Sequence, residues 1–259
     1  MRNTLKVGNV TLNGVSVYVL ECNDDDAAEP DYEAISVPGR SGDLHIWNER
    51  WKNKLVTYKC ACMVNAKTVV PALITQLLTQ YGYQRIEDTF HPEYYKMGEY
   101  VGATTPVYSP GGDAAKFNLT FDCKPQKWLL SGEAEQSVSS GVILTNPTNV
   151  PAYPLFKIQG YGNLDFWTDY ISVNKHSTLG TLKITDAGIA VGATNYLMYD
   201  CDVNYAYDSV SNVSYNSYAR FKRNTFIRNS DRGYLSAGKT RLYWDNTMSV
   251  KIIPRWCAL

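Results

Sequence analysis

The sequence predicts a mainly β protein of two domains, with one flanking α-helix in the first domain. Three observations support this fold class. Short runs alternate apolar and polar residues along most of the chain, turn-forming Gly, Pro and Asn residues separate the runs, and one segment has helical spacing instead. The chain has 259 residues, 44% of them apolar, so two domains with packed cores are expected.

The first strands are expected within residues 5–20, where β-branched and apolar residues alternate with polar ones. Asn13-Gly14 lies between two such runs and predicts a hairpin turn there. Residues 34–47 then read as a strand, a Pro-Gly turn and a second strand, and residues 55–64 as a further strand. The first domain therefore begins as a series of antiparallel strands.

An acidic cluster follows the first strands, just before Pro30. Four carboxylates close together can bind a metal ion, but the cluster lacks the spaced ligands of a calcium loop. We therefore expect a solvated loop without a bound metal. Its members are Asp24, Asp25, Asp26 and Glu29.

One helix of about three turns is expected between Thr68 and Tyr81, packed across a sheet. Pro71 is acceptable in its first turn, and Gly82 is well placed to end it. Its apolar residues recur at helical spacing and indicate a core-facing side, not a cofactor site. They are Val70, Leu73, Ile74, Leu77, Leu78 and Tyr81.

The alternating segment 116–123 predicts another strand, and a polar stretch followed by crowded Asn and Pro residues comes after it. We place the domains at residues 1–135 and 151–259, with a linker at 136–150. The second domain consists of short alternating runs separated by turns about every ten residues, typical of a sandwich or barrel. Its final strand, within 249–259, could close that domain or pack on the first.

Charge and termini exclude some classes of function. The 25 basic residues equal the 25 acidic ones, so there is no excess positive charge for binding nucleic acid. The first ten residues lack the apolar core of a secretion signal, and no run approaches the roughly 20 apolar residues of a membrane span. We expect a protein made in a cytoplasm, with no membrane anchor.

The six cysteines are scattered and form no CxxC pair. Cys60 and Cys62 would point to the same face of a strand. We expect small buried hydrophobic side chains, not a disulfide scaffold or a zinc site. The cysteines are Cys22, Cys60, Cys62, Cys123, Cys201 and Cys257.

No catalytic motif stands out, and we expect neither an enzyme nor a bound cofactor or metal. The sequence has no HExxH zinc motif, no GxSxG nucleophile turn and no phosphate-binding loop. None of His45, His91 and His176 has a second histidine three or four residues away. A glycosidase would need only two carboxylates placed by the fold. The possible members of such a pair are Glu87, Asp88, Asp165 and Asp169. We expect them instead to be exposed charges at strand ends.

The turn at residues 37–44, VPGRSGDL, carries more information than the other turns. Two glycines flank Arg40 and Ser41 inside a sharp reversal, because glycine readily adopts positive φ. One arginine therefore projects from a rigid turn. Taken locally, this is an exposed turn with a solvated charge.

In its full order the sequence resembles the siphophage distal tail protein (Dit) family, whose members are tail-tip or baseplate ring components. The matching pieces are spread over nearly the whole chain, and residues 194–233 match in strand pattern alone. In order, the pieces are Val37–Leu44, a helix ending near Gly82, Glu93-Tyr94-Tyr95, Phe117–Phe121 before Cys123-Lys124-Pro125, Pro154, Gly160-Tyr161-Gly162, Ile252–Trp256 and a final leucine.

The resemblance implies a structural protein of the virion tail tip. Family members form a hexameric ring that joins the tail tube to the tail-associated lysin or hub protein, and DNA passes through the ring. The first domain would be a tail-tube-like β-sandwich and the second a galectin-like β-sandwich facing outward. Receptor-binding or carbohydrate-binding proteins attach to the outer domains in some phages. In this setting an inter-subunit or hub contact is expected at Pro38, Gly39, Arg40, Gly42 and Asp43.

The alternative function is a carbohydrate-binding module that contacts the host cell wall. Aromatic faces stack on sugars, although in a sandwich they more often form core or cross-strand pairs. A wall hydrolase is a third class and depends on the unplaced carboxylates alone. The aromatic residues that suggest sugar binding are Trp167, Tyr170, Tyr205, Tyr207 and Tyr218.

Overall fold

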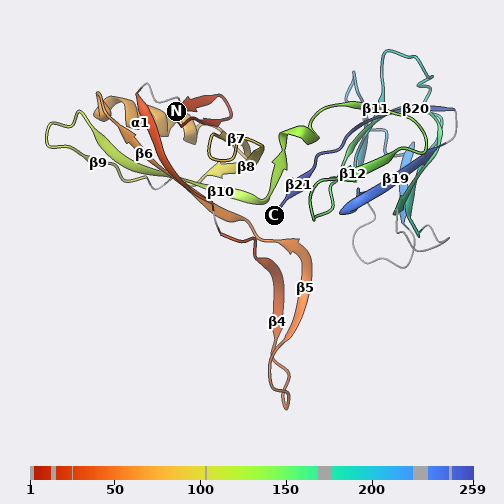
Figure 1. Ribbon diagram of the computed structural model, residues 1–259, viewed down its shortest axis with the longest axis horizontal. Coiled ribbons are helices and arrows are strands. Elements are labelled where there is room, and N and C mark those ends of the chain that lie inside the picture. The colour runs from red at the N-terminus through yellow and green to blue at the C-terminus, as the bar shows by residue number, and fades with distance from the viewer. Residues whose placement is uncertain are drawn as a thin grey trace. The chain divides into compact units, whose positions relative to one another are not determined.

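The computed structural model describes residues 3–12, 16–24, 26–102, 104–168, 177–223, 233–244 and 247–259. The chain divides into unit 1, Met1–Lys127 with Leu259, and unit 2, Trp128–Ala258. The described residues are mainly β, with several sheets and a single α-helix, which confirms the predicted fold class (Figure 1).

Unit 1 is organised around one sheet, whose main path runs β2-β1-β7-β8-β10-β6-β3, with β9 paired beside β10. A long contact joins β6 and β10, which pair from Lys54↔Cys123 to Cys62↔Ala115. The strands are β1 (Leu5–Val7), β2 (Val10–Leu12), β3 (Val17–Asn23), β6 (Lys54–Cys62), β7 (Gln84–Asp88), β8 (Tyr94–Tyr100), β9 (Val107–Tyr108) and β10 (Ala115–Leu129).

The first hairpin joins β1 and β2 at a turn that the sequence pattern did not predict. Val7 pairs with Val10 across a two-residue turn in which Gly8 has φ 55°, so β1 and β2 reverse at Gly8-Asn9. The predicted turn at Asn13-Gly14 lies outside the described residues.

The helix α1 (Ala66–Leu78) buries one side against the core of unit 1. It begins two residues earlier than predicted, so Pro71 lies in its second turn and not in its first. Tyr81 lies beyond the end of the helix and is 87% exposed, so its predicted place in the apolar stripe is wrong. The buried residues of the helix are Ala66, Val70, Leu73 and Leu77.

Two strands of unit 1 stand apart from its sheet. β4 (Pro30–Ile35) and β5 (Leu44–Trp51) pair with each other as a two-stranded sheet. We call residues 30–51 the arm, and Figure 1 shows it running out from the sheet of its unit as a narrow ribbon. Nearly all described side chains from Glu33 to Arg50 are exposed, so the arm has no core of its own.

Unit 2 is a sandwich of two five-stranded antiparallel sheets, ordered β11-β20-β13-β16-β17 and β12-β19-β14-β15-β18. Phe166 bridges the two sheets, since its ring packs edge-on against Phe156 at 5.5 Å and against Phe221 at 5.6 Å. The ten strands are β11 (Gln136–Val138), β12 (Ile143–Asn146), β13 (Leu155–Gly160), β14 (Gly162–Thr168), β15 (Ser177–Ile184), β16 (Leu197–Asp200), β17 (Tyr205–Asp208), β18 (Ala219–Arg223), β19 (Gly238–Trp244) and β20 (Met248–Ile253). A further short strand, β21 (Cys257–Ala258), lies outside these two sheets and pairs with β10.

The segment expected to be a linker, 136–150, contains the two short strands β11 and β12. β11 pairs with β20 and β12 pairs with β19, each at one edge of a sheet of unit 2. Edge strands tolerate polar residues because one of their sides faces no further strand, which explains the polar composition. A short 3-10 helix at Leu130–Gly132 precedes β11 and β12. The strand β20, within the segment whose packing the sequence left open, lies between β11 and β13 in a sheet of unit 2.

The cysteines behave as small apolar residues. Five of the six are buried and Cys22 is partly exposed, and all six thiols are free. Within the described part of the chain, no helix is long and apolar enough to cross a membrane.

Candidate functional site

The predicted contact turn forms the tip of the arm. Gly39 has φ 80° and Gly42 has φ 84°, values that favour glycine. The Arg40 amide donates a hydrogen bond to the Val37 carbonyl oxygen at 3.2 Å, which closes the turn. Pro38, Gly39, Arg40, Gly42 and Asp43 are all exposed. Their role in contacts between proteins stays a prediction.

Both faces of the arm carry apolar side chains, because successive residues of each strand point to opposite faces and apolar residues occur in both positions. Tyr32 pairs with Trp47 on one face, and Ile35 pairs with Leu44 on the other. Tyr32, Leu44 and Trp47 are each 40% exposed or more. The arm is thus apolar on two sides and covered on neither by the described residues of its own chain.

Local contacts keep the ribbon together. The Tyr32 ring stacks on His45 at 4.4 Å, and the Trp47 indole N–H donates to the Arg50 carbonyl oxygen at 3.3 Å. Arg50 forms an ion pair with Asp31 at 2.7 Å, in which the arginine is largely exposed. An isolated two-stranded hairpin is marginally stable in water, and these exposed contacts add little.

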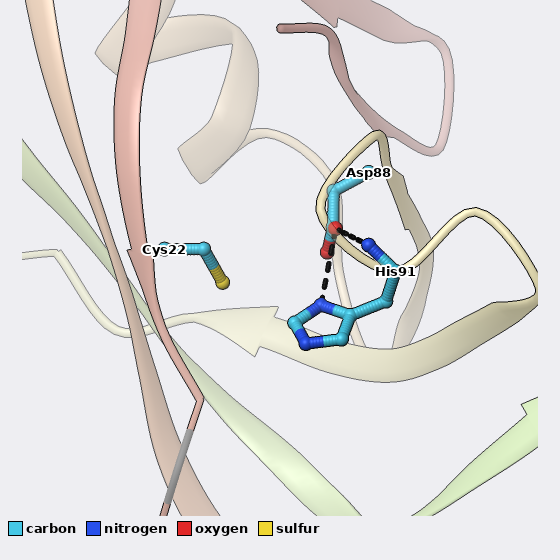
Figure 2. Close-up of side chains that lie close together, drawn as sticks. All are labelled: Cys22, Asp88 and His91. Atoms are coloured by element: carbon cyan, nitrogen blue, oxygen red, sulfur yellow. Dashed lines mark hydrogen bonds and ion pairs between the residues drawn. The ribbon is translucent and has the colours of Figure 1, made fainter.

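A second notable place is a polar cluster where the arm joins the sheet. Figure 2 shows Cys22 on β3 and, facing it, Asp88 at the end of β7 and His91 in the turn that follows. One Asp88 oxygen accepts hydrogen bonds from the His91 amide at 2.8 Å and lies 3.2 Å from His91 Nδ1. Among the described residues these three side chains have possible metal-ligating atoms within 4.8 Å of one another.

The charges around this group argue against a metal ion. The Lys96 ammonium lies 2.8 Å from Asp88 Oδ2 and 3.4 Å from His91 Nδ1, where a cation would have to bind. Burial raises the pKa of the Cys22 thiol to about 11, so the thiolate that a metal needs is scarce at neutral pH. The arrangement is a network of paired charges and not an open coordination site.

Asp24 is the centre of this network. Its carboxylate lies 2.7 Å from the Lys54 ammonium, 3.0 Å from that of Lys96 and 2.9 Å from that of Lys127, and its side chain is 0% exposed. The expectation of a solvated acidic loop is therefore wrong for Asp24, while Asp26 and Glu29 are exposed as expected. Asp25 lies outside the described residues.

The pKa values follow from this geometry. Burial alone would raise the pKa of Asp24, but the Lys96 charge and the contacts with Lys54 and Lys127 outweigh it and lower that pKa to about 2. The same balance, with Lys96 as the main opposing charge, lowers the pKa of Asp88. Burial alone would lower the pKa of Lys96, yet Asp88 and Asp24 raise it. All three groups are therefore charged at neutral pH.

The sequence held a signal for this cluster that composition alone did not reveal. Lys54 is in phase with Val56 and Tyr58, which point into the core, and Lys96 is in phase with Tyr100. A lysine on the inward phase of a strand needs a buried counter-charge. Several such lysines in separate strands could have predicted that a nearby carboxylate is buried too.

The other predicted residues do not converge on a reaction centre. Glu87 pairs with Arg85 at 2.5 Å, whereas Asp88, its neighbour on the strand, belongs to the buried network. Asp165 lies in unit 2, apart from Glu87 and Asp88 in unit 1. It is on β14 and accepts a hydrogen bond from Thr181 of the same unit. Asp169, Tyr170 and His176 lie outside the described residues.

The aromatic residues proposed for sugar binding lie in different sheets of unit 2. Trp167 is on β14 and packs against Tyr243 at 5.1 Å between ring centres. Tyr205 stacks on Tyr207 at 6.1 Å on β17, a strand of the opposite sheet. Tyr218 packs edge-on against Tyr215 just before β18. These residues form local pairs and not one shared platform.

Comparisons with known proteins identify the fold. No family model matches the chain, and no curated protein matches it. The crystal structure of the Dit protein (gp 19.1) of phage SPP1 superposes with a TM-score of 0.67 at 14% identity, covering 97% of this chain and 98% of that one. That protein is described as a paradigm of the hub adsorption apparatus in phages that infect Gram-positive bacteria.

Chains of the phage P2 baseplate in its activated conformation, one structure with Ca and one with Sr, also match. Each has a TM-score of 0.46, with identities of 9% and 10%. The first covers 97% of this chain and 98% of its own, and the second 96% and 97%. The match to the SPP1 Dit protein, with its TM-score of 0.67, shows that the chain has the fold of that protein over nearly its whole length.

Proposed function

We propose that the chain is a structural protein of a phage tail tip that assembles into a hexameric ring. The ring would join the tail tube to the tail-associated lysin or hub protein. The shared fold with SPP1 Dit supports this proposal, since the match spans nearly all of both chains. The observation that carries it is the arm, whose two apolar faces are left open by the described residues of its own chain.

The arm is well suited to contact a neighbouring subunit. Apolar side chains on both faces of a thin ribbon stabilise it when another protein covers them, at about 25 cal/mol per Å² buried. A ring needs two different complementary patches on each subunit. The arm supplies one such patch, with Arg40 at its tip as a charge that fixes register, and the next copy supplies the other.

The two units would divide the work. Unit 1 would be the tail-tube-like ring domain, and unit 2 a galectin-like domain on the outside of the ring that faces the host-recognition proteins. The ring would enclose a lumen through which DNA passes, and the protein would reside in the virion tail tip after synthesis in the host cytoplasm. Catalysis has no part in this function.

The test is the state of association of the purified protein. Light scattering over a range of concentrations, with negative-stain images of the largest species, should reveal rings of six subunits. The double variant Ile46→Ser, Trp47→Ser removes one apolar side chain from each face of the arm and should weaken association at least about tenfold. Val107→Ser is the matched control, because Val107 is 70% exposed in unit 1 but outside the arm.

Monomers at every accessible concentration of the wild-type protein would contradict the proposal. So would rings that form equally well with the double variant and with the control. Loss of association in the Val107→Ser control as well would show that the arm is not the specific contact.

A carbohydrate-binding module remains the second candidate, favoured by the exposed Tyr243 beside Trp167 in unit 2. Two aromatic side chains on adjacent strands form a surface on which a sugar can stack. A glycan array with the full chain, compared with Tyr243→Ala, tests it. Binding that the substitution abolishes would support this function, and the absence of binding would remove it.

A further inference from the structure

Asp24 and Lys54 mark the two places where the arm leaves the sheet. Asp24 follows directly after β3, before the arm begins at Pro30, and Lys54 opens β6, just after the arm ends at Trp51. Their side chains meet at 2.7 Å and are 0% and 7% exposed. The Lys54 ammonium also lies 3.4 Å from the Asp26 carbonyl oxygen. One buried ion pair therefore closes the root of the arm.

The same carboxylate attaches the root to the sheet. Asp24 contacts Lys96 on β8 at 3.0 Å and Lys127 on β10 at 2.9 Å. Lys96 in turn contacts Asp88 at 2.8 Å, and Asp88 accepts a hydrogen bond from the Tyr58 hydroxyl at 2.6 Å. Asp24 thus joins both sides of the root to two other strands.

The balance of charges makes Asp24 hard to replace within this group. Lys54, Lys96 and Lys127 supply three positive charges, whereas Asp24 and Asp88 supply two negative ones. Without Asp24, the nearly buried Lys54 would have no carboxylate partner among the contacts described, and a buried unpaired ammonium is strongly unfavourable. The pair is therefore retained whenever the root is folded as observed.

Few other contacts hold the root. The Lys52 amide donates to the Glu29 carbonyl oxygen at 2.8 Å, and the Asn53 side chain donates to the Tyr83 hydroxyl at 2.6 Å and to Asp122 at 3.1 Å. The Asn53 contacts are exposed to solvent, where such interactions contribute little. Beyond the root, the described side chains of the arm are exposed and give it no further anchor to the sheet.

We propose that Asp24, Lys54, Lys96 and Lys127 form a root clamp that fixes the arm to the sheet and so presents it in one direction for docking. These are positioning residues, since they act through the arm and touch no partner. The docking role depends on the proposed function. The local role, holding the root closed, belongs to the isolated chain.

The experiment is hydrogen–deuterium exchange of the full chain, followed peptide by peptide, together with light scattering. Lys54→Met removes the ammonium that closes the root and keeps the aliphatic stem, while Asp24 retains Lys96 and Lys127. The matched control is Lys59→Met, which breaks the exposed pair with Glu21 at 2.5 Å between the same strands, β3 and β6.

Lys54→Met is expected to speed exchange at least about tenfold in peptides covering residues 22–32 and 50–56, with α1 and β13 protected as in the wild type. Its association should weaken, whereas Lys59→Met should match the wild type in both measurements. Asp24→Asn should give a larger effect of the same kind. If one of these two variants fails to fold, the other one provides the test.

Unchanged exchange at the root in a folded Lys54→Met or Asp24→Asn variant would overturn the clamp. Faster exchange spread evenly over unit 1 would also overturn it, because the cluster would then stabilise the whole core and not the root. If the wild-type protein never associates, the proposed function fails, yet the exchange pattern still decides whether the clamp exists.

Discussion

The Lys96 ammonium lies 2.8 Å from the Asp88 carboxylate, and both side chains are 2% exposed. Such a buried pair is costly to break, because the remaining partner keeps its charge without a counter-ion. Lys96 also forms an ion pair with Asp24. Its removal would therefore leave two buried carboxylates with less positive charge beside them.

Lys96→Met is expected to lower the free energy of unfolding by about 3–5 kcal/mol, the range for breaking a buried ion pair. Lys59→Met, which breaks the exposed pair with Glu21, should cost no more than about 1 kcal/mol. Urea denaturation followed by tryptophan fluorescence measures both. A Lys96→Met protein as stable as Lys59→Met would show that the buried network contributes little net stability.

Stability should fall in acid through Asp24. Its pKa is lowered from 3.8 to about 2 in the folded chain, so its contribution is complete above pH 4 and is lost as the pH falls toward 2. The difference corresponds to about 2 kcal/mol. The charged groups facing it are Lys54, Lys96 and Lys127, with His91 Nδ1 4.0 Å away.

Urea midpoints between pH 2 and pH 6 test this, with Asp24→Asn as the comparison. The variant should be less stable at pH 6 and should lose less stability on acidification than the wild type. Parallel pH profiles for the two proteins would contradict the assignment of this acid sensitivity to Asp24.

Gly160 and Gly238 form a natural matched pair in unit 2. Both have positive φ, 86° and 88°, but an added Cβ at Gly160 would lie 2.0 Å from the Thr247 carbonyl oxygen, whereas at Gly238 it would meet nothing within 4 Å. Gly238→Ala should cost about 1–2 kcal/mol from backbone strain alone. Gly160→Ala should cost clearly more, and thermal unfolding compares them. Equal losses would mean that the backbone at Thr247 yields readily.

Arg40→Glu reverses the charge at the tip of the arm without touching its strands. Because the side chain is exposed, the monomer should keep its stability within about 0.5 kcal/mol. Association of subunits, or binding to the hub protein, should weaken and show a changed dependence on salt. Lys116→Glu, an exposed reversal elsewhere in unit 1, is the control. Unchanged assembly of Arg40→Glu would exclude a role for this charge.

Local pattern predicted much of the fold. Alternation at residues 55–64 and 116–123 marked β6 and the start of β10, and the 3.6-residue spacing found α1 to within two or three residues at each end. The limits of the helix were less accurate, since Asn65 adopts a left-handed conformation at its start and Tyr81 lies past its end. Propensity sets the type of an element more firmly than its ends.

The sequence by itself determined which face of each strand is apolar, the sharp turn at 38–43 and the absence of recognisable catalytic motifs. These are local properties, set by residues within a few positions of one another. Tertiary structure alone decided that Asp24 is buried, because its partners come from residues 54, 96 and 127, on three other strands. It also decided that residues 30–51 leave the sheet as an arm. The inward phase of Lys54 and Lys96 signals that some carboxylate is buried. Which carboxylate it is, and where the chain leaves the sheet, depend on which distant strands become neighbours.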